Sequence, residues 1–487
     1  MKLLKDILYK VRIEEVVGNT HIATEGMTMD SRAVRPFHLF AAIRGFNQDG
    51  HLYISKAIES GANCIVCEHL PQELIAEVTY VRVQDSAEAL GIIAANYFDN
   101  PSEKIKVVGV TGTNGKTTVA TLMYELCESL GKKAGLLSTV VNKIHNESIP
   151  STHTTPNAIE LQKLLSQMVE AGCEYAFMEV SSHALDQKRT AGLKFVGAAF
   201  TNITHDHLDY HGSFNAYIKA KKLLFDGLGA EAFALINNDD RHAEVMSQNC
   251  KGRVYTFALH TMANYRARIM ENSLAGLSLT IQQHELYTQL IGEFNAYNLL
   301  AVFGISVQLG WDEISVLTAL STLKAPEGRF QYLRSDKGVV AIVDYAHTPD
   351  ALANVLDTIG AIRSGNEKLI CVMGCGGDRD KAKRPVMGQI ACEKASHVIV
   401  TSDNPRSEEP KQIIQDIVGS MNPIERKKVL TMVDREEAIA AACALAAPGD
   451  IILIAGKGHE KYQEIQGVKH PFDDYQKVKD QLKSIEA

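Results

Sequence analysis

A strand that runs into a glycine-rich turn and then into a helix constrains this chain more than any other feature of its sequence. Residues 105–110 are mostly apolar and predict a buried strand, and apolar residues at helical spacing over 119–130 predict the helix. The turn between them reads Thr111-Gly112-Thr113-Asn114-Gly115-Lys116-Thr117-Thr118. Because backbone N–H groups in such a turn, together with the N-terminus of its helix, bind phosphate oxygens, we predict a phosphate-binding loop.

Lys116 and Thr117 define the chemistry of this loop. The lysine adds a full positive charge, and the threonine hydroxyl is placed to reach a Mg²⁺ ion. One departure from the usual G-x-x-x-x-G-K pattern is Val110, which stands where that pattern has its first glycine. The alternative, a glycine-rich turn that binds no ligand, is disfavoured by the strand before it and the helix after it.

The composition limits the class of protein. The chain has 487 residues, 45% of them hydrophobic, and a formal net charge of −8 without a long basic run, which disfavours nucleic acid as its main partner. The N-terminal residues show no signal-peptide core, and no stretch is apolar for long enough to span a membrane. Nine scattered cysteines, of which only Cys64 and Cys67 are closely spaced, disfavour a zinc site and are typical of reduced thiols in a cytoplasm.

Three blocks can be distinguished along the chain, and we predict domains at 1–103, 104–334 and 335–487. The last block alternates most regularly. Its predicted strands are 339–344, 369–373, 397–402, 428–433 and 451–455, and its predicted helices are 349–362, 384–394, 410–421 and 435–446. Such alternation is typical of a mainly parallel, doubly wound sheet, so the predicted fold class is α/β.

Polar segments follow four of the strands predicted in this last block. They are Asp344-Tyr345-Ala346-His347, Gly374-Cys375-Gly376-Gly377-Asp378-Arg379, Asp403-Asn404-Pro405-Arg406 and Gly456-Lys457-Gly458-His459-Glu460. Ligands of open α/β sheets bind outside the carboxyl ends of the strands, so these segments predict a binding edge. A dinucleotide site is disfavoured, because the third glycine of its fingerprint is missing after Gly376.

The middle block adds a carboxylate, a histidine-rich segment and a lysine cluster. Glu179 ends an apolar run and is a candidate Mg²⁺ ligand, although a capping or surface role remains an alternative. The segment 202–211 holds three histidines and two aspartates, which fits a metal site and a hydrogen-bonded loop equally well. Lys219, Lys221 and Lys222 share one predicted helix, and the residue pattern does not distinguish among them.

These motifs, taken in order, resemble the Mur ligases, the ATP-dependent amide-forming enzymes of peptidoglycan synthesis. The resemblance runs from Asp30-Ser31-Arg32 to Gly458-His459-Glu460, so it covers nearly the whole chain. It rests on Thr111–Thr117, Thr154-Thr155-Pro156, Glu179–His183, Asp206–His211 and Asp403–Arg406. It implies a UDP-substrate domain, a central P-loop-type ATPase domain and a C-terminal Rossmann-like domain that binds the amino acid.

The resemblance also implies roles for individual residues. The catalytic set is Lys116, Glu179, His207 and Lys221, with Lys221 carried as a carbamate derived from CO₂. Mg²⁺ is implied at Thr117, Glu179, His207 and Lys221. ATP is implied at Gly112, Thr113, Asn114, Gly115, Lys116, Thr117, Thr118, Asn295, Asn298, Arg329, Asp344 and His347. The UDP substrate is implied at Met29, Ser31, Phe46, Asn47, Gln48, His153, Thr154, Thr155, Ser181, Gln187 and Arg189, with Phe46 standing where some relatives have His. The amino acid is implied at Arg379, Asp403, Asn404, Pro405, Arg406, Gly456 and Glu460.

The implied reaction has two steps. The D-Glu side-chain carboxylate of UDP-MurNAc-L-Ala-D-Glu attacks the γ-phosphate of ATP, and the resulting acyl phosphate is attacked by an amine. Mg²⁺ and Lys116 would offset the repulsion between the two anions that meet in the first step. The implied enzyme is a cytoplasmic monomer that acts on small molecules, without nucleic acid or membrane partners.

Arg406 bears on which amino acid supplies the amine. A guanidinium offers a planar fork for the distal carboxylate of meso-diaminopimelate, which L-lysine lacks. The motif Asp403–Arg406 resembles that of the diaminopimelate-adding members. The alternatives are the same reaction with L-lysine, a folylpolyglutamate synthetase, a nucleotide-binding module without chemistry, and, for Arg406 itself, a surface charge before a helix.

Overall fold

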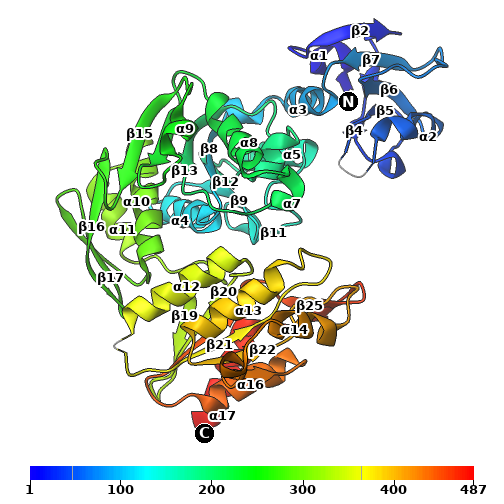
Figure 1. Ribbon diagram of the computed structural model, residues 1–487. Helices are drawn as coiled ribbons and strands as arrows, with labels where there is room; N and C mark the ends of the chain where they lie inside the picture. The colour runs from blue at the N-terminus through cyan, green and yellow to red at the C-terminus, as the bar shows by residue number, and fades with distance from the viewer. Residues whose placement is uncertain (46–47, 364, 487) are drawn as a thin grey trace. The chain divides into compact units, whose positions relative to one another are not determined.

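The computed structural model describes residues 1–45, 48–363 and 365–486. They form two compact units, each made of several ranges of the chain. Figure 1 colours the chain by residue number, from blue at the N-terminus to red at the C-terminus. The first unit comprises Met1–Gly112, Met123–Thr201 and Asn215–Thr256, and the second comprises Thr113–Leu122, Asn202–Phe214 and Phe257–Ala487. Within the described ranges, no helix has both the length and the apolar character that crossing a membrane requires.

A five-stranded sheet forms the N-terminal part of the first unit, in the order β2-β7-β6-β5-β4. Its strands are β2 (Ile13–Val17), β4 (Gly26–Thr28), β5 (His38–Ala41), β6 (Ala62–Cys67) and β7 (Thr79–Val83), and only β2 is antiparallel to its neighbour. Successive side chains of a strand point to opposite faces. Val66 therefore packs in one core with α1 (Leu4–Ile7) and α3 (Ser86–Tyr97), and Ile65 packs in another with α2 (Ile54–Glu59).

Strands of a second sheet make up the rest of the first unit, in the order β11-β10-β9-β12-β8-β13-β14. They are β8 (Lys106–Thr111), β9 (Ala134–Leu137), β10 (Val141–Ile144), β11 (Glu147–Pro150), β12 (Tyr175–Glu179), β13 (Phe195–Phe200) and β14 (Phe233–Asn237). All are parallel except the hairpin β10–β11. The associated helices are α4 (Lys116–Ser129), α5 (Ala158–Glu170), α6 (Ser182–Asp186), α8 (Phe214–Asp226) and α9 (Ala243–Ser247). A Cβ on Gly135 would lie 2.2 Å from Sδ of Met168, so the glycine lets α5 pack closely against β9.

The second unit contains an antiparallel meander of β16 (Tyr265–Ser273), β17 (Gly276–Ile281) and β18 (His284–Thr288). The last two residues of β15 (Arg253–Ala258) pair with β16. The short helix α7 (Leu208–His211) and the helices α10 (Glu293–Gln308) and α11 (Glu313–Leu320) also belong to this unit. Residues 298–306 of α10 are all buried, which accounts for its lack of a polar face.

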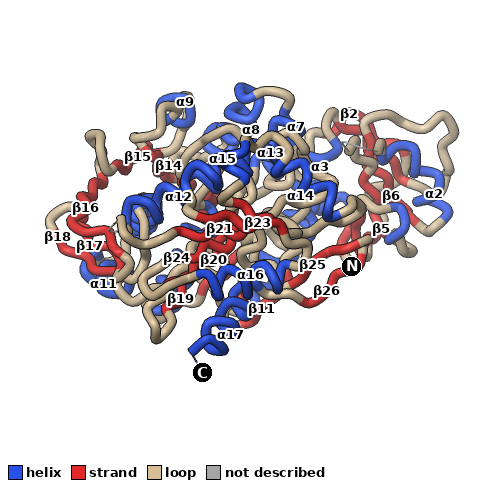
Figure 2. Tube along the Cα trace, turned by 60° about the horizontal axis from the view of Figure 1, so that its bottom comes forward, coloured by secondary structure: helices blue, strands red, loops and turns tan. Residues whose placement is uncertain are grey.

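The C-terminal sheet has the order β19-β20-β24-β21-β22-β23, and only its edge strand β19 is antiparallel. Its strands are β19 (Gln331–Arg334), β20 (Val340–Asp344), β21 (Leu369–Met373), β22 (His397–Val400), β23 (Val429–Thr431) and β24 (Ile451–Ala455). Helices α12 (Pro349–Ile362), α13 (Lys383–Lys394) and α14 (Pro410–Val418) share one core with this sheet, whereas α16 (Arg435–Leu445) and α17 (Asp474–Glu486) share the other. Figure 2 shows these two groups of helices on either side of the strands.

The predicted strands and helices of this last block are confirmed, most of them to within two residues. The doubly wound, mainly parallel α/β architecture is confirmed as well, because the sheet is covered by helices on both faces. The sequence pattern missed the edge strand β19, the short helix α15 (Pro423–Arg426), the hairpin β25–β26 (Tyr462–Ile465 and Val468–Pro471) and α17. The sequence pattern does not predict the hairpin because its strands have only four residues each and all residues of its second strand are exposed.

Candidate active site

The predicted phosphate loop follows β8 and opens α4 at Lys116. Gly115 has a φ of +86°, which side chains with a Cβ rarely adopt and which lets the chain turn into the helix. Asn202 holds the turn, since its carbonyl accepts a hydrogen bond from N of Thr113 (2.8 Å) and its Oδ1 accepts one from N of Asn114 (3.0 Å). Asn202 opens the histidine-rich segment 202–211, in which the sequence pattern gave it no role of its own. Its place two residues beyond β13 is the signal that could have found it.

Lys116 and Thr117 lie where the loop becomes helix. Nζ of Lys116 donates to the carbonyl of Thr113 at 2.8 Å, so the lysine folds back over its own loop. Thr117 is buried, and its Oγ1 accepts a hydrogen bond from Nη2 of Arg329 at 3.1 Å. The loop therefore carries a lysine and a helix N-terminus, and a guanidinium contacts its Thr117 hydroxyl, which is an arrangement suited to a triphosphate.

Arg329 also contacts a group of rings from the segments that follow β20 and β24. Its guanidinium lies 4.7 Å from the ring centroid of Tyr345, and the rings of His347 and His459 lie 4.6 and 4.9 Å from that of Tyr345. Asp344, at the end of β20, accepts a hydrogen bond from N of Phe330 at 2.7 Å. We call Arg329, Asp344, Tyr345, His347 and His459 the Arg329 cluster.

Burial determines the protonation of this cluster. It raises the pKa of Asp344, and it lowers the pKa of His347 and brings that of His459 to about 3, with Arg329 disfavouring a second positive charge at His459. Both imidazoles are thus neutral at pH 7. Within the described ranges, Nδ1 of His459 is buried without a hydrogen-bond partner. His459 was missed as a site residue, although it stands in the predicted segment 456–460.

The two asparagines expected near the nucleotide lie on α10. Nδ2 of Asn298 donates to Oδ1 of Asn295 at 3.1 Å, and Nδ2 of Asn295 donates to the carbonyl of Ile291 at 2.8 Å. Both are buried. These bonds hold their amides in one orientation within the second unit.

Glu179 ends β12 in the first unit and is 1% exposed. Its Oε1 accepts a hydrogen bond from N of Thr139 at 2.7 Å, and its Oε2 accepts one from Oγ1 of the same residue at 3.2 Å. The alternative of a surface carboxylate is therefore wrong. Oγ1 of Thr139 also lies 3.0 Å from Oγ1 of Thr154, whose hydroxyl can donate to it, and this bond ties Glu179 to the predicted substrate segment. Thr139 is a further residue that no sequence motif indicated.

Several residues expected to contact the UDP substrate come together beside Glu179. Oγ1 of Thr155 donates to the carbonyl of Glu179 (2.9 Å) and accepts from N of Ser181 (3.1 Å). Arg189 donates to the carbonyl of Thr155 at 2.9 Å and to Oε1 of Gln187 through two nitrogens. His153 lies on the exposed side of this group. The structure thus joins residues 34 positions apart into one polar cluster.

Lys221 is the lysine that the fold singles out from the three on α8. It is 1% exposed, its Nζ donates to the carbonyl of Gly112 at 2.7 Å, and it lies 4.6 Å from the ring centroid of Tyr217. Lys219 is exposed, and Lys222 pairs with Asp226. Lys221 therefore contacts the residue at which the phosphate loop starts.

His207 has a left-handed backbone (φ +53°) just before α7. Its N donates to Oδ1 of Asp206 at 2.9 Å, and its Nε2 lies 3.4 Å from Oδ2 of the same aspartate. Nearby, the rings of His205 and Phe214 stack at 4.3 Å. Residues 202–207 form a hydrogen-bonded loop before α7, and in the described ranges no three His, Cys, Asp or Glu side chains form a ready-made metal site.

Two of the polar segments in the C-terminal sheet are bound to each other. N of Gly377 donates to the carbonyl of Asn404 at 2.9 Å, and Nη1 of Arg406 donates to the carbonyl of Gly377 at 2.8 Å. A Cβ on Gly377 would lie 1.9 Å from the carbonyl oxygen of Pro405, so only glycine permits this approach. Arg379 lies on the exposed surface of the first segment.

The hairpin β25–β26 covers the segment 403–406. N of Arg406 donates to the carbonyl of Glu464 at 3.0 Å, and N of Glu464 donates to Oδ1 of Asn404 at 2.9 Å. Nε of Arg406 also lies 3.5 Å from Oε2 of Glu464. Asp403 and Asn404 are buried, whereas Arg406 and Glu460 keep part of their side chains exposed. The guanidinium of Arg406 is thus held by Gly377 and Glu464 while part of the side chain stays exposed. The alternative of a surface charge before a helix is therefore wrong.

The expected uridine contacts fall in the N-terminal sheet region. Met29 is exposed and Ser31 is buried, on either side of Asp30. Arg32 bonds to Asp30 through side chain and backbone and lowers the pKa of that carboxyl to about 2. Gln48 is exposed. Phe46 and Asn47 lie outside the described residues.

These residues fit ATP with Mg²⁺ in chemical terms. In the second unit, the loop offers backbone N–H groups, the Lys116 ammonium and the hydroxyl of Thr117. In the first unit, taken by itself, Glu179 offers one buried carboxylate. Mg²⁺ is commonly held by one or two carboxylates together with phosphate oxygens and water rather than by a complete protein cage.

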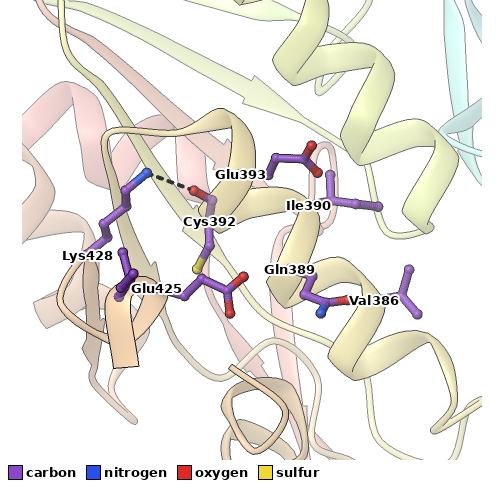
Figure 3. Close-up of a pocket in the computed structure, with 8 residues that line it drawn as sticks. Val386, Gln389, Ile390, Cys392, Glu393, Glu425 and Lys428 are labelled. Carbon is purple, nitrogen blue, oxygen red and sulfur yellow. Dashed lines mark hydrogen bonds between the residues drawn. The ribbon is translucent and has the colours of Figure 1, made fainter. Parts of the chain in front are cut away.

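A separate pocket of about 480 Å³ lies between α13 and the segment around α15. Figure 3 shows its lining, in which Nζ of Lys428 donates to the carbonyl of Cys392 at 3.1 Å. Val386, Ile390 and Ile424 make part of its wall apolar. None of the residues predicted for catalysis, nucleotide or substrate lines it, so this pocket is distinct from the candidate active site.

Comparisons of the sequence and of the fold with known proteins point to one family. Residues 110–306 match the Mur ligase middle domain, residues 328–458 match the Mur ligase glutamate ligase domain, and residues 23–98 match the catalytic domain of the Mur ligase family. The chain is 53% identical over 483 residues to the UDP-N-acetylmuramoyl-L-alanyl-D-glutamate–2,6-diaminopimelate ligase of Cytophaga hutchinsonii, covering 99% of each chain. It is 51% identical to the protein of the same name from Bacteroides thetaiotaomicron, covering 98% of this chain and 99% of the relative. A solved structure of a ligase with that name superimposes with a TM-score of 0.71 at 33% identity, covering 100% of this chain and 99% of the other.

Proposed function

The chain belongs to the Mur ligase family, and on that basis we propose that it is an ATP-dependent ligase that joins meso-diaminopimelate to the D-Glu side-chain carboxylate of UDP-MurNAc-L-Ala-D-Glu. One observation carries the choice of amino acid. Arg406 and Glu460, a cation and an anion that both stay partly exposed, lie on segments bound to each other through Asn404 and the hairpin β25–β26. The distal end of diaminopimelate carries the complementary pair, a carboxylate and an ammonium.

The phosphate loop supports the first half of the reaction. Lys116 and the N-terminus of α4 neutralise the triphosphate, so that the incoming carboxylate meets less negative charge. Thr117 would hold Mg²⁺, which, when bound, polarises the γ-phosphoryl group. Glu179, His207 and Lys221 are the further Mg²⁺ ligands that the family resemblance implies. In the Arg329 cluster, the neutral imidazoles and the buried Asp344 provide hydrogen-bond partners for the rest of the nucleotide.

Lys221 supports the same step from the first unit. As a carbamate it would carry negative charge next to Gly112, where the phosphate loop starts, and would add oxygen ligands of the kind that Mg²⁺ prefers. The polar cluster of Thr155, Ser181 and Arg189 is suited to hold the muramoyl dipeptide beside Glu179.

The second half of the reaction needs the amine and must exclude water. The carboxylate has become an acyl phosphate, with ADP released, and phosphate is a good leaving group when the amine attacks. Arg406 and Glu460 hold the distal end of the diamino acid, which leaves its other amino group to attack the acyl carbon. A positioned amine competes with water because it is already in place.

Phosphate release tests the proposal directly. We expect release only when ATP, the UDP-muramoyl dipeptide and an amino acid are all present, with meso-diaminopimelate far better than L-lysine in a panel of amino acids. Mass spectrometry should show the UDP-tripeptide. Equal use of lysine would favour the lysine-adding alternative, and turnover with a folate and glutamate would favour a folylpolyglutamate synthetase.

Three further features complete the proposal. The UDP-substrate, ATP and amino-acid functions belong to the domains 1–103, 104–334 and 335–487. We propose that the enzyme works in the cytoplasm, which its nine free cysteines favour. It acts as a monomer, and size-exclusion chromatography with light scattering tests this.

A further inference from the structure

Lys457 is a fully buried lysine at the carboxyl end of the C-terminal sheet. It follows β24 in the turn Gly456-Lys457-Gly458, where both glycines have positive φ values, +117° and +53°. Its side chain is 0% exposed. Lysine is almost never fully buried unless it is paired, because the ammonium loses its hydration. The acceptors around it must therefore account for its position.

Three acceptors surround the ammonium of Lys457. Its Nζ donates to Oδ1 of Asn404 at 2.9 Å, and it lies 3.3 Å from Oε2 of Glu460 and 3.5 Å from Oδ1 of Asp403. Two other fully buried cations of the C-terminal sheet region have partners elsewhere: Arg435 is bound to Asp474 through Nε and Nη2, and Arg384 is bound to Glu408 and Asp416. Lys457 is thus the cation that Asp403 and Glu460 share.

The ammonium determines which way the amide of Asn404 points. An ammonium only donates, so the amide oxygen must face Lys457. That oxygen also accepts from N of Glu464, and Nδ2 consequently faces Glu460, donating to its Oε2 at 2.7 Å. With the amide reversed, two donors would oppose each other at Lys457, and two acceptors would oppose each other at Glu460.

Glu460 is held through only one of its oxygens. Lys457 and Asn404 both bind Oε2, and Oε1 accepts no hydrogen bond from the described part of the chain. The side chain is 16% exposed. One oxygen is therefore fixed by the protein, whereas the other has no hydrogen-bond donor among the described residues.

We propose that Lys457 is a positioning residue for the amino-acid substrate. It holds Glu460 and Asn404 in the arrangement in which Oε1 of Glu460 receives the distal ammonium of a diamino acid. The inference rests on the proposed function and deepens it, because it explains how the anionic half of the pocket is built. Lys457 does not touch the substrate, since its side chain is fully buried.

The test compares Lys457→Met with Lys461→Met in the full-length enzyme. Both substitutions remove one positive charge, but Lys461 is 60% exposed and pairs with Glu327 instead. Loss of a charge-assisted hydrogen bond in the pocket predicts that Lys457→Met raises the KM for meso-diaminopimelate about ten-fold or more, while the KM for ATP changes less than about two-fold. The Lys461→Met enzyme should resemble the parent.

A double-mutant cycle with Glu460→Gln separates positioning from general damage. If Lys457 acts through Glu460, Lys457→Met should add little to the KM defect of Glu460→Gln. The double variant removes the charge of Glu460 together with that of Lys457, so it leaves one unpaired carboxylate fewer than Lys457→Met and remains testable where that single variant fails to fold. Two results would overturn the positioning role of Lys457 and leave the proposed function intact. One is KM defects of the two single variants that add up in the double variant, and the other is an unchanged KM for meso-diaminopimelate in folded Lys457→Met. A parent enzyme that uses no diamino acid would overturn the proposed function, and this inference with it.

Discussion

Nη2 of Arg329 donates a hydrogen bond to Oγ1 of Thr117, 3.1 Å away in space and 212 positions earlier in the chain. The bond joins the first turn of α4 to the segment that leads into β19. Arg329 also covers the ring of Tyr345, so one side chain contacts both the phosphate loop and the aromatic group beside it. A nucleotide bound at the loop would meet this guanidinium.

Replacing Arg329 by lysine should weaken nucleotide use while keeping the charge. Lysine has no planar fork, and it cannot both stack on Tyr345 and bond to Thr117. We expect the KM for ATP to rise about ten-fold, measured by phosphate release at saturating levels of the other substrates. Arg334→Lys, at an exposed position of β19, is the matched control and should change nothing. An unaltered ATP KM in Arg329→Lys would contradict the assignment.

Arg406→Ala should abolish discrimination between amino acids. The guanidinium is anchored to Gly377 and is the cationic half of the pocket. Removing a bidentate charged contact predicts a loss in kcat/KM for meso-diaminopimelate of about 100-fold, with ATP affinity retained. The exposed Lys411→Ala on α14 serves as control. Equal turnover by variant and parent at limiting diaminopimelate would remove Arg406 from the pocket.

Lys221→Ala should be inactive and open to chemical rescue. Bicarbonate with a short carboxylic acid should restore part of the activity, because the acid can stand in for the carbamate oxygens. Lys219→Ala is a sharp control, since Lys219 is two positions away on α8 but exposed. Activity of Lys221→Ala that needs no added acid would speak against a carbamate.

Asp474→Ala should destabilise the second unit. Asp474 and Arg435 are both fully buried and bound through two hydrogen bonds, and Arg435 also donates to the carbonyl of Ala455. Leaving the guanidinium unpaired predicts a loss of about 3–5 kcal/mol in the free energy of unfolding. Urea unfolding followed by circular dichroism measures it. The double change Arg435→Met with Asp474→Leu should cost less, and a larger cost would refute this explanation.

His459 should make the free energy of unfolding depend on pH. Its pKa is lowered from 6.5 to about 3 by burial and nearby cations, so between these pH values the unfolded chain binds a proton that the folded chain does not. The folded state consequently loses stability as the pH falls below about 6.5. His459→Asn should reduce the difference in free energy of unfolding between pH 7 and pH 5. Identical pH dependence of variant and parent would show that the histidine is not buried neutral.

The C-terminal sheet shows which features of a fold the local sequence pattern can predict. Its parallel strands and principal helices follow from apolar runs and helical periodicity, because each element is set by hydrogen bonds and side-chain burial within a few residues. The order β20-β24-β21 did not follow, since β24 inserts between strands that are neighbours in sequence. The hairpin β25–β26 was missed because its short, exposed strands show no alternation, yet it holds Asn404 and Arg406 in place.

By itself the sequence determined the phosphate loop, the α/β class and the motifs of the family, all of which depend on residues close together in the chain. Only the tertiary structure decided which lysine of α8 is buried, that Thr139 and Asn202 hold the site residues, and that Lys457 lies between Asp403 and Glu460. The physical reason is that burial and charge pairing arise between distant segments. Lys219 and Lys221 have the same side chain and nearly the same local surroundings, and only the packing of α8 brings Lys221 to the carbonyl of Gly112.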